Sequence, residues 1–155
     1  MKDLTIRKAT LDDLEELLEL EQGVIAAERP FNATIKKANC TYYNLNDFIT
    51  DDDTYLLVAE LNNKIIASGY SQLRVSGISL NHEQHAYLGF MYVAEQYRGR
   101  GINKQLMDVL MKWSKSRGIS DFYLDVYIEN LAAVRAYEKA GFSKCMVEMK
   151  LNIDE

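Results

Sequence analysis

The residues with the clearest chemical potential form one short stretch, Gln96-Tyr97-Arg98-Gly99-Arg100-Gly101. Gly99 and Gly101 have no Cβ atom, so the backbone there can take unusual dihedral angles and approach an anion closely. Arg98 and Arg100 add positive charge at the same place. When such a turn lies between a strand and a helix, it presents free backbone N–H groups to a phosphate. The stretch therefore predicts a binding site for a phosphorylated small molecule.

Two common phosphate-binding loops do not fit this spacing. A P-loop requires Gly-x-x-x-x-Gly-Lys-Ser/Thr, and the chain contains no such run. A dinucleotide fingerprint requires Gly-x-Gly-x-x-Gly, whereas Asn103 and Lys104 follow Gly101. The alternative without any ligand is a basic surface turn capped by glycines.

The elements on either side must position this stretch. Residues 86–93 are almost continuously apolar, which predicts a central strand buried on both faces. Residues 102–113 place apolar side chains at helical spacing, and Arg117 and Gly118 supply a basic last turn and a C-terminal glycine. The order strand, glycine-containing turn, helix is the order that anion binding by a helix N-terminus requires.

Hydrophobic periodicity predicts the rest of the fold. Before the stretch, we expect a strand at 4–8, a helix that is capped by Thr10 and ends before Pro30, and a short helix within 35–46. We then expect paired strands at 54–61 and 65–75, joined by an Asn62-Asn63 turn, and a loop at 76–83. After the helix that follows the stretch, we expect a strand over 122–126, a helix over 130–140 stopped by Gly141, and one or two strands within 142–151. This order predicts a mixed α/β sheet covered by helices.

Composition limits the classes of function. A chain of 155 residues predicts a single domain, residues 1–155. The net charge of −5 argues against nucleic-acid binding, and no apolar run approaches the roughly 20 residues that span a bilayer. Cys40 and Cys145 are typical of reduced thiols, which together with the absence of a signal-peptide pattern predicts a cytoplasmic protein. His82 and His85 lack a third ligand at a recognisable spacing, so we expect no metal site.

Four features together resemble the GCN5-related N-acetyltransferase (GNAT) family over nearly the whole chain. The stretch from Gln96 to Gly101 fits the signature Gln/Arg-x-x-Gly-x-Gly/Ala, which in that family grips the pyrophosphate of acetyl-CoA. The preceding strand ends Met91-Tyr92-Val93; in the family this strand is bulged, splays from its neighbour and binds pantetheine through backbone groups. The resemblance implies the GNAT acyl-CoA N-acyltransferase fold: α/β, with a mixed, mostly antiparallel central sheet flanked by helices.

The other two features lie near the C-terminus. Asn130 stands where the family commonly contacts CoA, although a helix N-cap is an equally good role for it. In the run Ala132-Ala133-x-x-x-Tyr137-x-x-x-Gly141-Phe142, small residues admit the cofactor and the tyrosine is the family's usual acid for the departing thiolate. The reference pKa values of tyrosine and a thiol are about 10 and 8.5, so a strong hydrogen bond to sulfur is favoured over full proton transfer. The alternative for Tyr137 is a half-buried aromatic of an amphipathic helix.

The resemblance thus implies acetyl-CoA as co-substrate, no metal, and direct transfer without a covalent enzyme intermediate. A backbone N–H near Met91 would hold the oxyanion. The implied cofactor-binding residues are Met91, Tyr92, Val93, Gln96, Arg98, Gly99, Arg100, Gly101, Ile102, Asn103, Asn130, Ala133 and Tyr137.

An amine acceptor must lose a proton before it attacks, because an amine with a pKa of about 10.4 is almost fully protonated near pH 7. His85 lies eleven residues before Gln96, where the histone-acetylating branch has a catalytic glutamate. An imidazole is a reasonable base, and we name His85 with Tyr137 as the catalytic pair. Glu83 and Glu28 are alternatives, and a plain polar residue at a strand edge is the alternative role for His85.

The acceptor's identity stays open, because family members vary in the regions that correspond to 24–46 and 76–85. Glu28, Tyr42, Tyr43 and Asp47 could bind a cationic or aromatic amine, or be ordinary surface residues. We expect a primary amine of a small molecule or a protein, no nucleic acid, no membrane, and a monomer or homodimer. Two alternatives are an acyl-CoA-binding sensor or regulatory module without turnover and, with less support, a nucleotide-binding domain.

Overall fold

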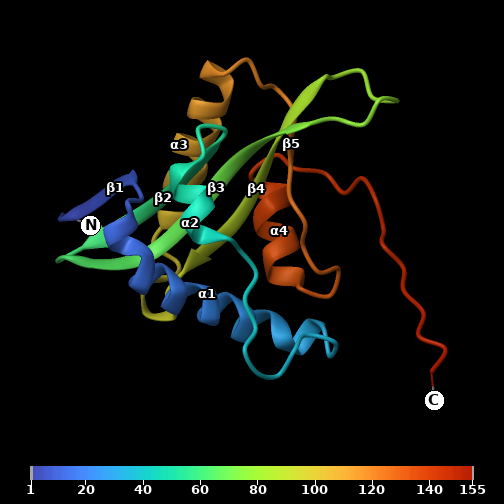
Figure 1. The fold of residues 1–155 in the computed structure, drawn as a ribbon, viewed down its shortest axis with the longest axis horizontal. Helices are drawn as coiled ribbons and strands as arrows, with labels where there is room; N and C mark the ends of the chain where they lie inside the picture. Colours follow the sequence, from blue (N-terminus) through green and yellow to red (C-terminus); the bar gives the residue numbers. More distant parts are fainter. Residues whose placement is uncertain (1, 155) are drawn as a thin grey trace. The chain divides into compact units, whose positions relative to one another are not determined.

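A computed structural model of the protein describes residues 2–154. The chain divides after Asp125 into two compact units, each described here on its own. The first unit contains a five-stranded sheet in the order β1-β2-β3-β4-β5. Its strands are β1 (Leu4–Lys8), β2 (Thr54–Leu61), β3 (Lys64–Val75), β4 (Gln84–Val93) and β5 (Phe122–Tyr123). The first four are antiparallel and β5 runs parallel to β4, which confirms the predicted mixed, mostly antiparallel sheet (Figure 1).

Helices cover both faces of this sheet (Figure 1). The helices α1 (Leu14–Glu28) and α2 (Leu45–Thr50) lie over one face, where the Tyr70 ring of β3 is 4.9 Å from the Phe48 ring of α2. The helix α3 (Ile102–Ser116) lies over the other face: a Cβ on Gly69, the strand neighbour of Tyr70, would lie 3.4 Å from Leu110 of α3. Because successive residues of a strand face opposite sides, these two contacts define the two covered faces.

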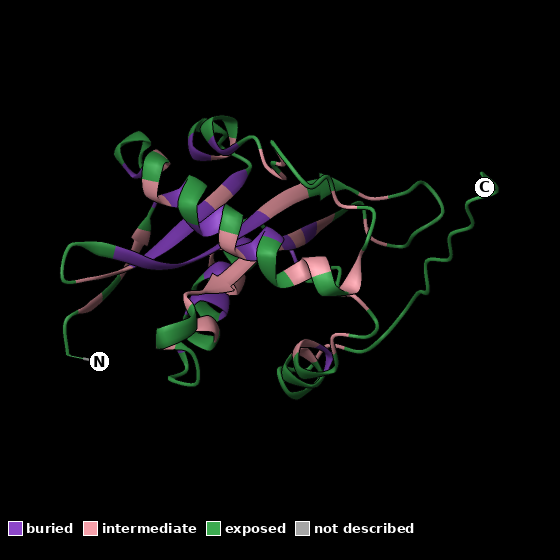
Figure 2. Ribbon diagram, turned by 90° about the horizontal axis from the view of Figure 1, so that it is seen from below, coloured by how far each residue is buried: buried purple, intermediate pink, exposed green. Residues whose placement is uncertain are grey.

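The core lies in the central strands, as the buried residues in Figure 2 show. In β4, Ala86, Leu88 and Phe90 are buried, whereas the residues that alternate with them, His85, Tyr87 and Gly89, are only partly buried. The prediction that this strand is buried on both faces is therefore wrong. The face that carries Tyr87 is the α1/α2 face, and it opens toward solvent near the start of β4.

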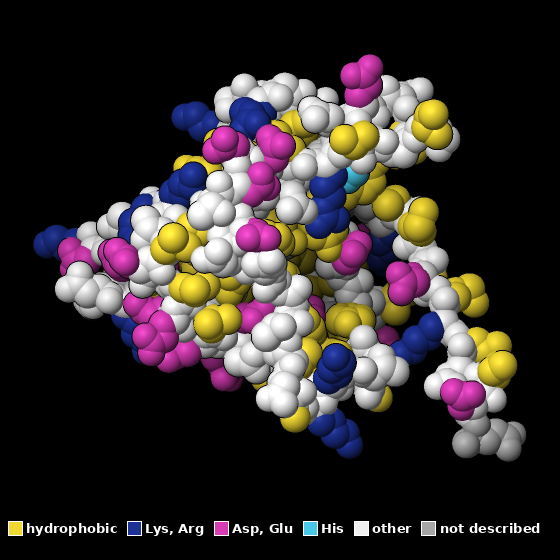
Figure 3. Space-filling model, in the orientation of Figure 1, with side chains coloured by type: hydrophobic (Ala, Val, Ile, Leu, Met, Phe, Trp, Pro, Cys, Tyr) yellow, Lys and Arg dark blue, Asp and Glu magenta, His cyan; other side chains and the backbone are white. Residues whose placement is uncertain are grey.

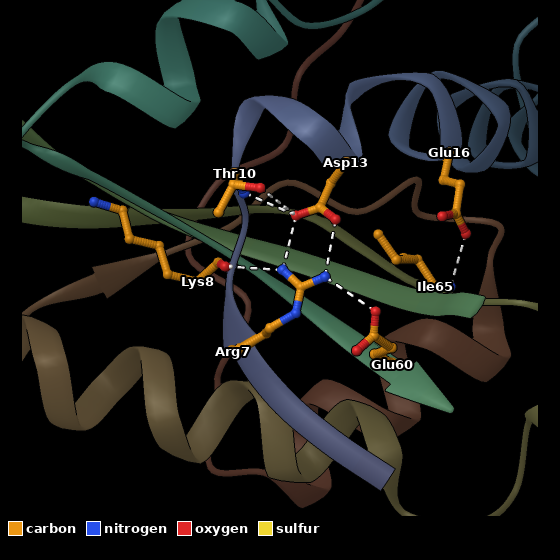
Figure 4. A network of polar contacts seen from close by, with 7 residues as sticks. All are labelled: Arg7, Lys8, Thr10, Asp13, Glu16, Glu60 and Ile65. Atoms are coloured by element: carbon orange, nitrogen blue, oxygen red, sulfur yellow. Dashed lines mark hydrogen bonds and ion pairs between the residues drawn. The ribbon is translucent and has the colours of Figure 1, made fainter. Parts of the chain in front are cut away.

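An ion-pair network around Arg7 connects β1 to β2 and to the residues just before α1 (Figure 4). The Arg7 guanidinium of β1 donates to Asp13 at 2.8 and 2.9 Å and to Glu60 of β2 at 3.1 Å. Its hydrogen bonds hold the pKa of the Asp13 carboxyl below the ordinary value. Asp13 also accepts the Thr10 backbone N–H at 2.7 Å, which confirms Thr10 as the residue that begins this helical region. The Glu16 carboxylate accepts the Ile65 N–H at 2.8 Å and so fixes α1 beside β3.

Most predicted boundaries are confirmed. A 3₁₀ turn, η1 (Leu11–Asp13), leads into α1, and a second one containing Pro30, η2 (Arg29–Phe31), follows it. The hairpin between β2 and β3 turns at Asn62 and Asn63, whose φ angles of 51° and 62° are those of a two-residue turn. Gly118, with a φ of 84°, closes α3. Among residues 2–154, no helix is both long and apolar enough to cross a membrane.

Two predictions in the first unit are wrong. The short helix expected within 35–46 begins only at Leu45, because the Asn44 side chain caps it by accepting the Asp47 N–H. The strand expected over 122–126 is paired only at its first two residues. The register joins Ala86 to Phe122 and Tyr87 to Tyr123 and goes no further.

The second unit contains α4 (Leu131–Lys139), capped by Asn130 and ended by Gly141, whose φ is 105°. These boundaries confirm the predicted helix. The strands expected within 142–151 are absent from the described residues, and that prediction is wrong. Apolar side chains do alternate there, but a strand also needs a hydrogen-bonded neighbour, and Val147, Met149 and Leu151 are 68–89% exposed.

Candidate functional site

The strand β4 carries a bulge near its C-terminal end. Its register with β3 shifts between Ser68 and Tyr70, so that Phe90 and Met91 both lie opposite Gly69. Such an extra residue is left outside the ladder and re-aims the backbone around it. The bulge implied by the family resemblance is therefore present at the strand position that the resemblance indicated.

The bulge is held in a specific conformation. Phe90 has a φ of 52°, in the left-handed region that few non-glycine residues adopt. The Ser68 hydroxyl donates a buried hydrogen bond of 2.9 Å to the Phe90 carbonyl, which satisfies the group displaced from the ladder. The Phe90 ring stacks on the Tyr43 ring at 4.7 Å. A strained residue held by its surroundings in this way is common at binding sites.

Beyond the bulge, one edge of β4 is open. The parallel partner β5 pairs with β4 only through Ala86 and Tyr87. Within the described residues, no strand pairs with residues 88–93 on that side. The N–H and C=O groups that point to this edge are therefore available to a ligand, in the manner of strand addition.

The glycine-containing turn follows directly. A 3₁₀ turn, η3 (Glu95–Tyr97), leads to Gly99 and Gly101, whose φ angles are 77° and 78°. Gly101 caps α3, and the first N–H bonded back to it is that of Gln105, at 3.1 Å. In the described chain, no acceptor bonds the backbone N–H groups of residues 99–104. These groups surround the positive end of a 15-residue helix, which is a favourable site for a phosphate.

The two arginines of the turn differ in their contacts. Arg98 donates through Nε to the Val93 carbonyl at 2.8 Å, and its guanidinium carbon lies 5.3 Å from the Tyr92 ring centre. Arg100 donates to the Gln96 carbonyl at 3.3 Å. Arg98 thus joins the end of β4 to the turn and occupies the Val93 carbonyl. Its other N–H groups remain for an anion.

The predicted cofactor residues from Met91 to Asn103 thus lie on one continuous path. Some of them can serve a ligand only through their backbone, because their side chains are packed inside. Ile102 is 2% exposed, and the Tyr92 ring lies over Gly23 of α1 so closely that a Cβ there would clash. The Asn103 Oδ1 atom is buried without a hydrogen-bond partner in the described chain.

The remaining predicted cofactor residues are on the second unit. The Asn130 Oδ1 accepts the Ala133 N–H at 3.3 Å, which confirms the N-cap role and leaves its amide nitrogen for other contacts. Ala133 and Tyr137 are one turn apart and share a side of α4. The Tyr137 ring meets the Phe142 ring edge-to-face at 6.0 Å. Their contact with CoA stays a prediction.

His85 lies on β4 opposite Arg74 of β3. Burial, with the positive charges of His82 and Arg74, lowers the pKa of the His85 imidazole, and Asp121 opposes this. His85 precedes Gly89 by four residues, which is about 13 Å along a strand. A proton could reach it from an amine at the bulge only through water.

Between His85 and the bulge lies an interacting group that the sequence motifs did not predict. The Tyr87 hydroxyl donates to the Asp125 carboxylate at 3.0 Å, and the Arg74 guanidinium carbon lies 3.9 Å from the Tyr87 ring centre. Burial raises the pKa of the Tyr87 hydroxyl most, and the negative charge of Asp125 raises it further. The phenol therefore stays protonated and acts as a hydrogen-bond donor. The sequence signal is the polar phase of the strand expected over 122–126, in which Tyr123 and Asp125 alternate with Phe122, Leu124 and Val126.

The candidate acceptor residues of α1 and the following loop form a connected group. The buried Glu21 carboxylate accepts the Tyr42 and Tyr43 backbone N–H groups at 2.9 and 2.8 Å, which holds this loop against α1. Burial raises the pKa of Glu28, and a hydrogen bond from Tyr42 opposes that shift. Asp47 lines a hollow of about 440 Å³ beside Phe48 and Gln72. Acidic side chains gather over α1 and α2 (Figure 3), so this side favours cationic ligands.

Cysteine and metal chemistry have little support among the described residues. Cys40 is partly buried, Cys145 is exposed, and neither is in a disulfide. Within residues 2–154, no three His, Cys, Asp or Glu side chains come together as a metal site would need.

The comparison with protein families now defines the class of protein. The sequence model described as the Acetyltransferase (GNAT) family matches residues 12–142, and the chain belongs to this family. The match includes β4, its bulge, the glycine-containing turn and α4.

Individual proteins match most of the length of this chain. The chain is 30% identical over 146 residues to an uncharacterized N-acetyltransferase of Methanocaldococcus jannaschii, covering 93% of this chain and 62% of that protein. It is 25% identical to an N-alpha-acetyltransferase of Saccharolobus solfataricus, covering 94% and 84%. The crystal structure of a predicted acetyltransferase with acetyl-CoA from Clostridium acetobutylicum has a TM-score of 0.77 at 21% identity, covering 97% and 96%. The chain thus spans less than two thirds of the M. jannaschii protein and shares the fold of the C. acetobutylicum one.

Proposed function

We propose that this protein is an N-acetyltransferase that moves an acetyl group from acetyl-CoA directly to a primary amine. The observation that carries the proposal is the bulged, open edge of β4 that leads into a turn with unpartnered N–H groups at residues 99–104. Strand-edge groups suit the amides of pantetheine, and the helix N-terminus suits its pyrophosphate. The acetyl-CoA in the C. acetobutylicum structure supports the same donor.

The donor would be held mainly by backbone groups. The Met91 backbone and the Val93 N–H would pair with pantetheine. The N–H groups of residues 99–104, together with the guanidinium groups of Arg98 and Arg100, would bind the pyrophosphate. The Asn130 amide nitrogen, left over from capping α4, would donate to CoA. A backbone N–H of the bulge would stabilise the oxyanion, because it is fixed before the reaction begins.

The transfer itself needs no covalent enzyme intermediate. The neutral amine attacks the thioester carbonyl, a tetrahedral intermediate forms, and the C–S bond breaks to release CoA thiolate. The Tyr137 hydroxyl donates a hydrogen bond to this sulfur, which lowers the free energy of the leaving group without requiring full proton transfer.

The acceptor side would hold a cation and remove its proton. The Asp125 carboxylate, which accepts a hydrogen bond from Tyr87, would attract an ammonium group between His85 and the bulge. His85 accepts the proton through water once the amine is bound. The acceptor is a small molecule or a protein; the S. solfataricus N-alpha-acetyltransferase favours testing protein N-termini first.

One experiment tests the function as a whole. Acetyl-CoA binding is measured by calorimetry, and free CoA thiol is then measured with a panel of peptides bearing free N-termini, lysine peptides, polyamines, amino acids and aminoglycosides. We expect micromolar binding and thiol release with at least one class. Binding without thiol release for every acceptor would favour the alternative, an acyl-CoA sensor of the same fold. Size-exclusion chromatography and cell fractionation would test the proposed monomer or homodimer and the proposed cytoplasmic location.

A further inference from the structure

A serine hydroxyl bridges the only two histidines of the chain at the loop end of the β3–β4 hairpin. The Ser76 Oγ lies 2.6 Å from the His82 Nδ1 and 2.9 Å from the His85 Nδ1. On the far side of the first ring, the His82 Nε2 lies 3.0 Å from the Tyr123 hydroxyl of β5. Four side chains, two from the β3–β4 loop, one from β4 and one from β5, therefore form one hydrogen-bonded row.

The row is packed as well as hydrogen-bonded. The His85 ring centre lies 4.9 Å from that of Tyr123 and 5.9 Å from that of His82. The Ser76 N–H donates to the Glu83 carbonyl at 2.8 Å, which closes the loop that carries His82. The charged groups that act on His85 are His82 on the loop, Arg74 opposite it on β3, and Asp121 before β5.

A single hydroxyl proton limits how the two imidazoles can be protonated. Ser76 can donate to one Nδ1 and must then accept from the other, so the two neutral histidines are opposite tautomers. An O–H donor generally comes closer to its acceptor than an N–H donor does: the most common distances to an oxygen acceptor are about 2.7–2.8 Å for O–H and about 2.9–3.0 Å for N–H. The contact of 2.6 Å therefore fits Ser76 donating to His82, and the contact of 2.9 Å fits His85 donating to Ser76.

The third distance agrees with this direction. A neutral His82 that accepts at Nδ1 carries its proton on Nε2, and the contact of 3.0 Å fits an N–H donated to Tyr123. His85, which carries its proton on Nδ1, has a lone pair on Nε2. The Nε2 of His85 is the nitrogen that can take a proton from outside the row.

We propose that Ser76, His82 and Tyr123 are positioning residues that hold His85 in the tautomer with an unprotonated Nε2, and that the two histidines share the proton that His85 accepts. The catalytic part of this inference rests on the proposed function, in which His85 receives the amine proton through water. The tautomer itself is a property of the free protein and does not depend on any substrate.

The proton count is simple. A proton from water binds the His85 Nε2. The Nδ1 proton of His85 can then pass to the Ser76 oxygen as the hydroxyl proton passes to the His82 Nδ1, which moves the positive charge to His82. No proton is lost in this step. When the transfer runs in reverse, the His85 Nε2 proton can leave to water, and the row returns to its starting tautomers. If a second proton is added, both Nδ1 atoms carry a proton and the Ser76 hydroxyl has no imidazole nitrogen left to donate to. The two histidines should therefore titrate in two separated steps.

Side-chain ¹⁵N NMR tests the tautomer directly. With only two histidines, His82→Asn and His85→Asn assign both rings. We expect His85 to be protonated on Nδ1 and His82 on Nε2 in the wild type near pH 8, and Ser76→Ala to abolish this pairing of tautomers. Ser116→Ala is the matched control, because Ser116 caps a carbonyl of α3 and touches no histidine. A His85 protonated on Nε2, or tautomers unchanged in Ser76→Ala, would overturn the inference.

Kinetics test the positioning role. In Ser76→Ala, kcat/KM for the amine should fall about tenfold, since the base is still present but its tautomer is no longer held. Rescue by Ser76→Thr, which keeps the hydroxyl, is expected, and the KM for acetyl-CoA should not change. An unchanged kcat/KM and pH profile would overturn the positioning role even if the spectra agree. If no amine is acetylated at all, the proposed function and the catalytic part fall together, and the spectra alone decide the tautomers.

Discussion

The two ends of β4 are built from different chemical groups. At the C-terminal end, Phe90 at a left-handed φ and the glycine-containing turn present backbone N–H groups. At the N-terminal end, Ser76, His85 and the Tyr87–Asp125 pair present side-chain groups that come from three parts of the chain: the β3–β4 loop, β4 and the segment after β5. We propose that the first end binds the donor and the second the acceptor. A backbone site depends on dihedral angles, whereas a side-chain site depends on which residues the fold brings together.

The difference has a consequence for variation. Most side chains of a backbone site can change as long as the chain keeps its path, so one donor can be retained while sequences diverge. A single substitution in a side-chain site alters charge or hydrogen bonding directly. Substitutions at the two ends should therefore fall into separate kinetic classes.

The largest effect is expected at Gly101. A valine there would have to adopt a φ near 78°, which costs roughly 1–3 kcal/mol and moves the first N–H groups of α3. We expect the acetyl-CoA dissociation constant, measured by calorimetry, to rise about 100-fold. Gly118→Val is the matched control: Gly118 has a φ of 84°, is equally open around its Cβ position, and closes the other end of α3. Equal losses of binding in both variants would mean that strain, and not the turn, explains the result.

The next effect concerns the leaving group. Tyr137→Phe removes one hydroxyl that would donate to the CoA thiolate, and a hydrogen bond to a charged group contributes about 2 kcal/mol. We expect kcat to fall about 30-fold with an unchanged acetyl-CoA dissociation constant. The ring contact with Phe142 is kept in this variant, so helicity measured by circular dichroism should not change. Full retention of kcat would remove Tyr137 from the mechanism.

A smaller, separate effect is expected at the acceptor end. Asp125→Asn removes the charge that would attract the ammonium group, so the amine KM should rise about tenfold while the acetyl-CoA dissociation constant stays the same. Tyr87→Phe should act in the same direction, because the carboxylate loses its 3.0 Å partner. Tyr55→Phe is the control, since the Tyr55 ring stacks on Trp113 on the α3 face of the sheet. A raised acetyl-CoA dissociation constant in Asp125→Asn would contradict the division between the two ends.

The donor end was readable in the sequence for a physical reason. Gly99 and Gly101 are needed at positive φ, and the strand, turn and helix that surround them are contiguous in the chain. Residues close together in the sequence were therefore enough to predict both the conformation of the turn and the class of ligand that it would bind. The capping residues Thr10 and Asn130 were readable for the same reason, because each partner is three residues away.

The acceptor end was not readable in this way. Tyr87 and Asp125 are 38 residues apart, and His82 and Tyr123 are 41 apart, so only the pairing of β4 with β5 brings them together. The alternation of apolar and polar side chains also failed to predict strands where no neighbouring strand pairs with the segment. Residues 142–151 have the side-chain pattern of a strand, but no strand of the described residues pairs with them. Similarly, β5 ends at Tyr123 although the alternating pattern continues to residue 126.

The smallest expected effect is a displacement in pH, and it tests the acceptor end most specifically. Burial and the charges of His82 and Arg74 lower the pKa of His85, so this base stays neutral, and therefore competent, to a pH below the ordinary 6.5. The acidic limb of kcat/KM for the amine should lie below pH 6.5 and disappear in His85→Ala. Arg74→Gln removes a positive charge, which makes the protonated imidazole less unfavourable, raises the pKa of His85 and moves the limb to higher pH. Arg74→Lys keeps the charge but changes the contact with the Tyr87 ring, so the limb should stay in place while the amine KM rises. A limb that does not move in Arg74→Gln would assign the proton-accepting role to a group other than His85, and the Asp125 carboxylate beside Tyr87 would then be the next to test by the same profile.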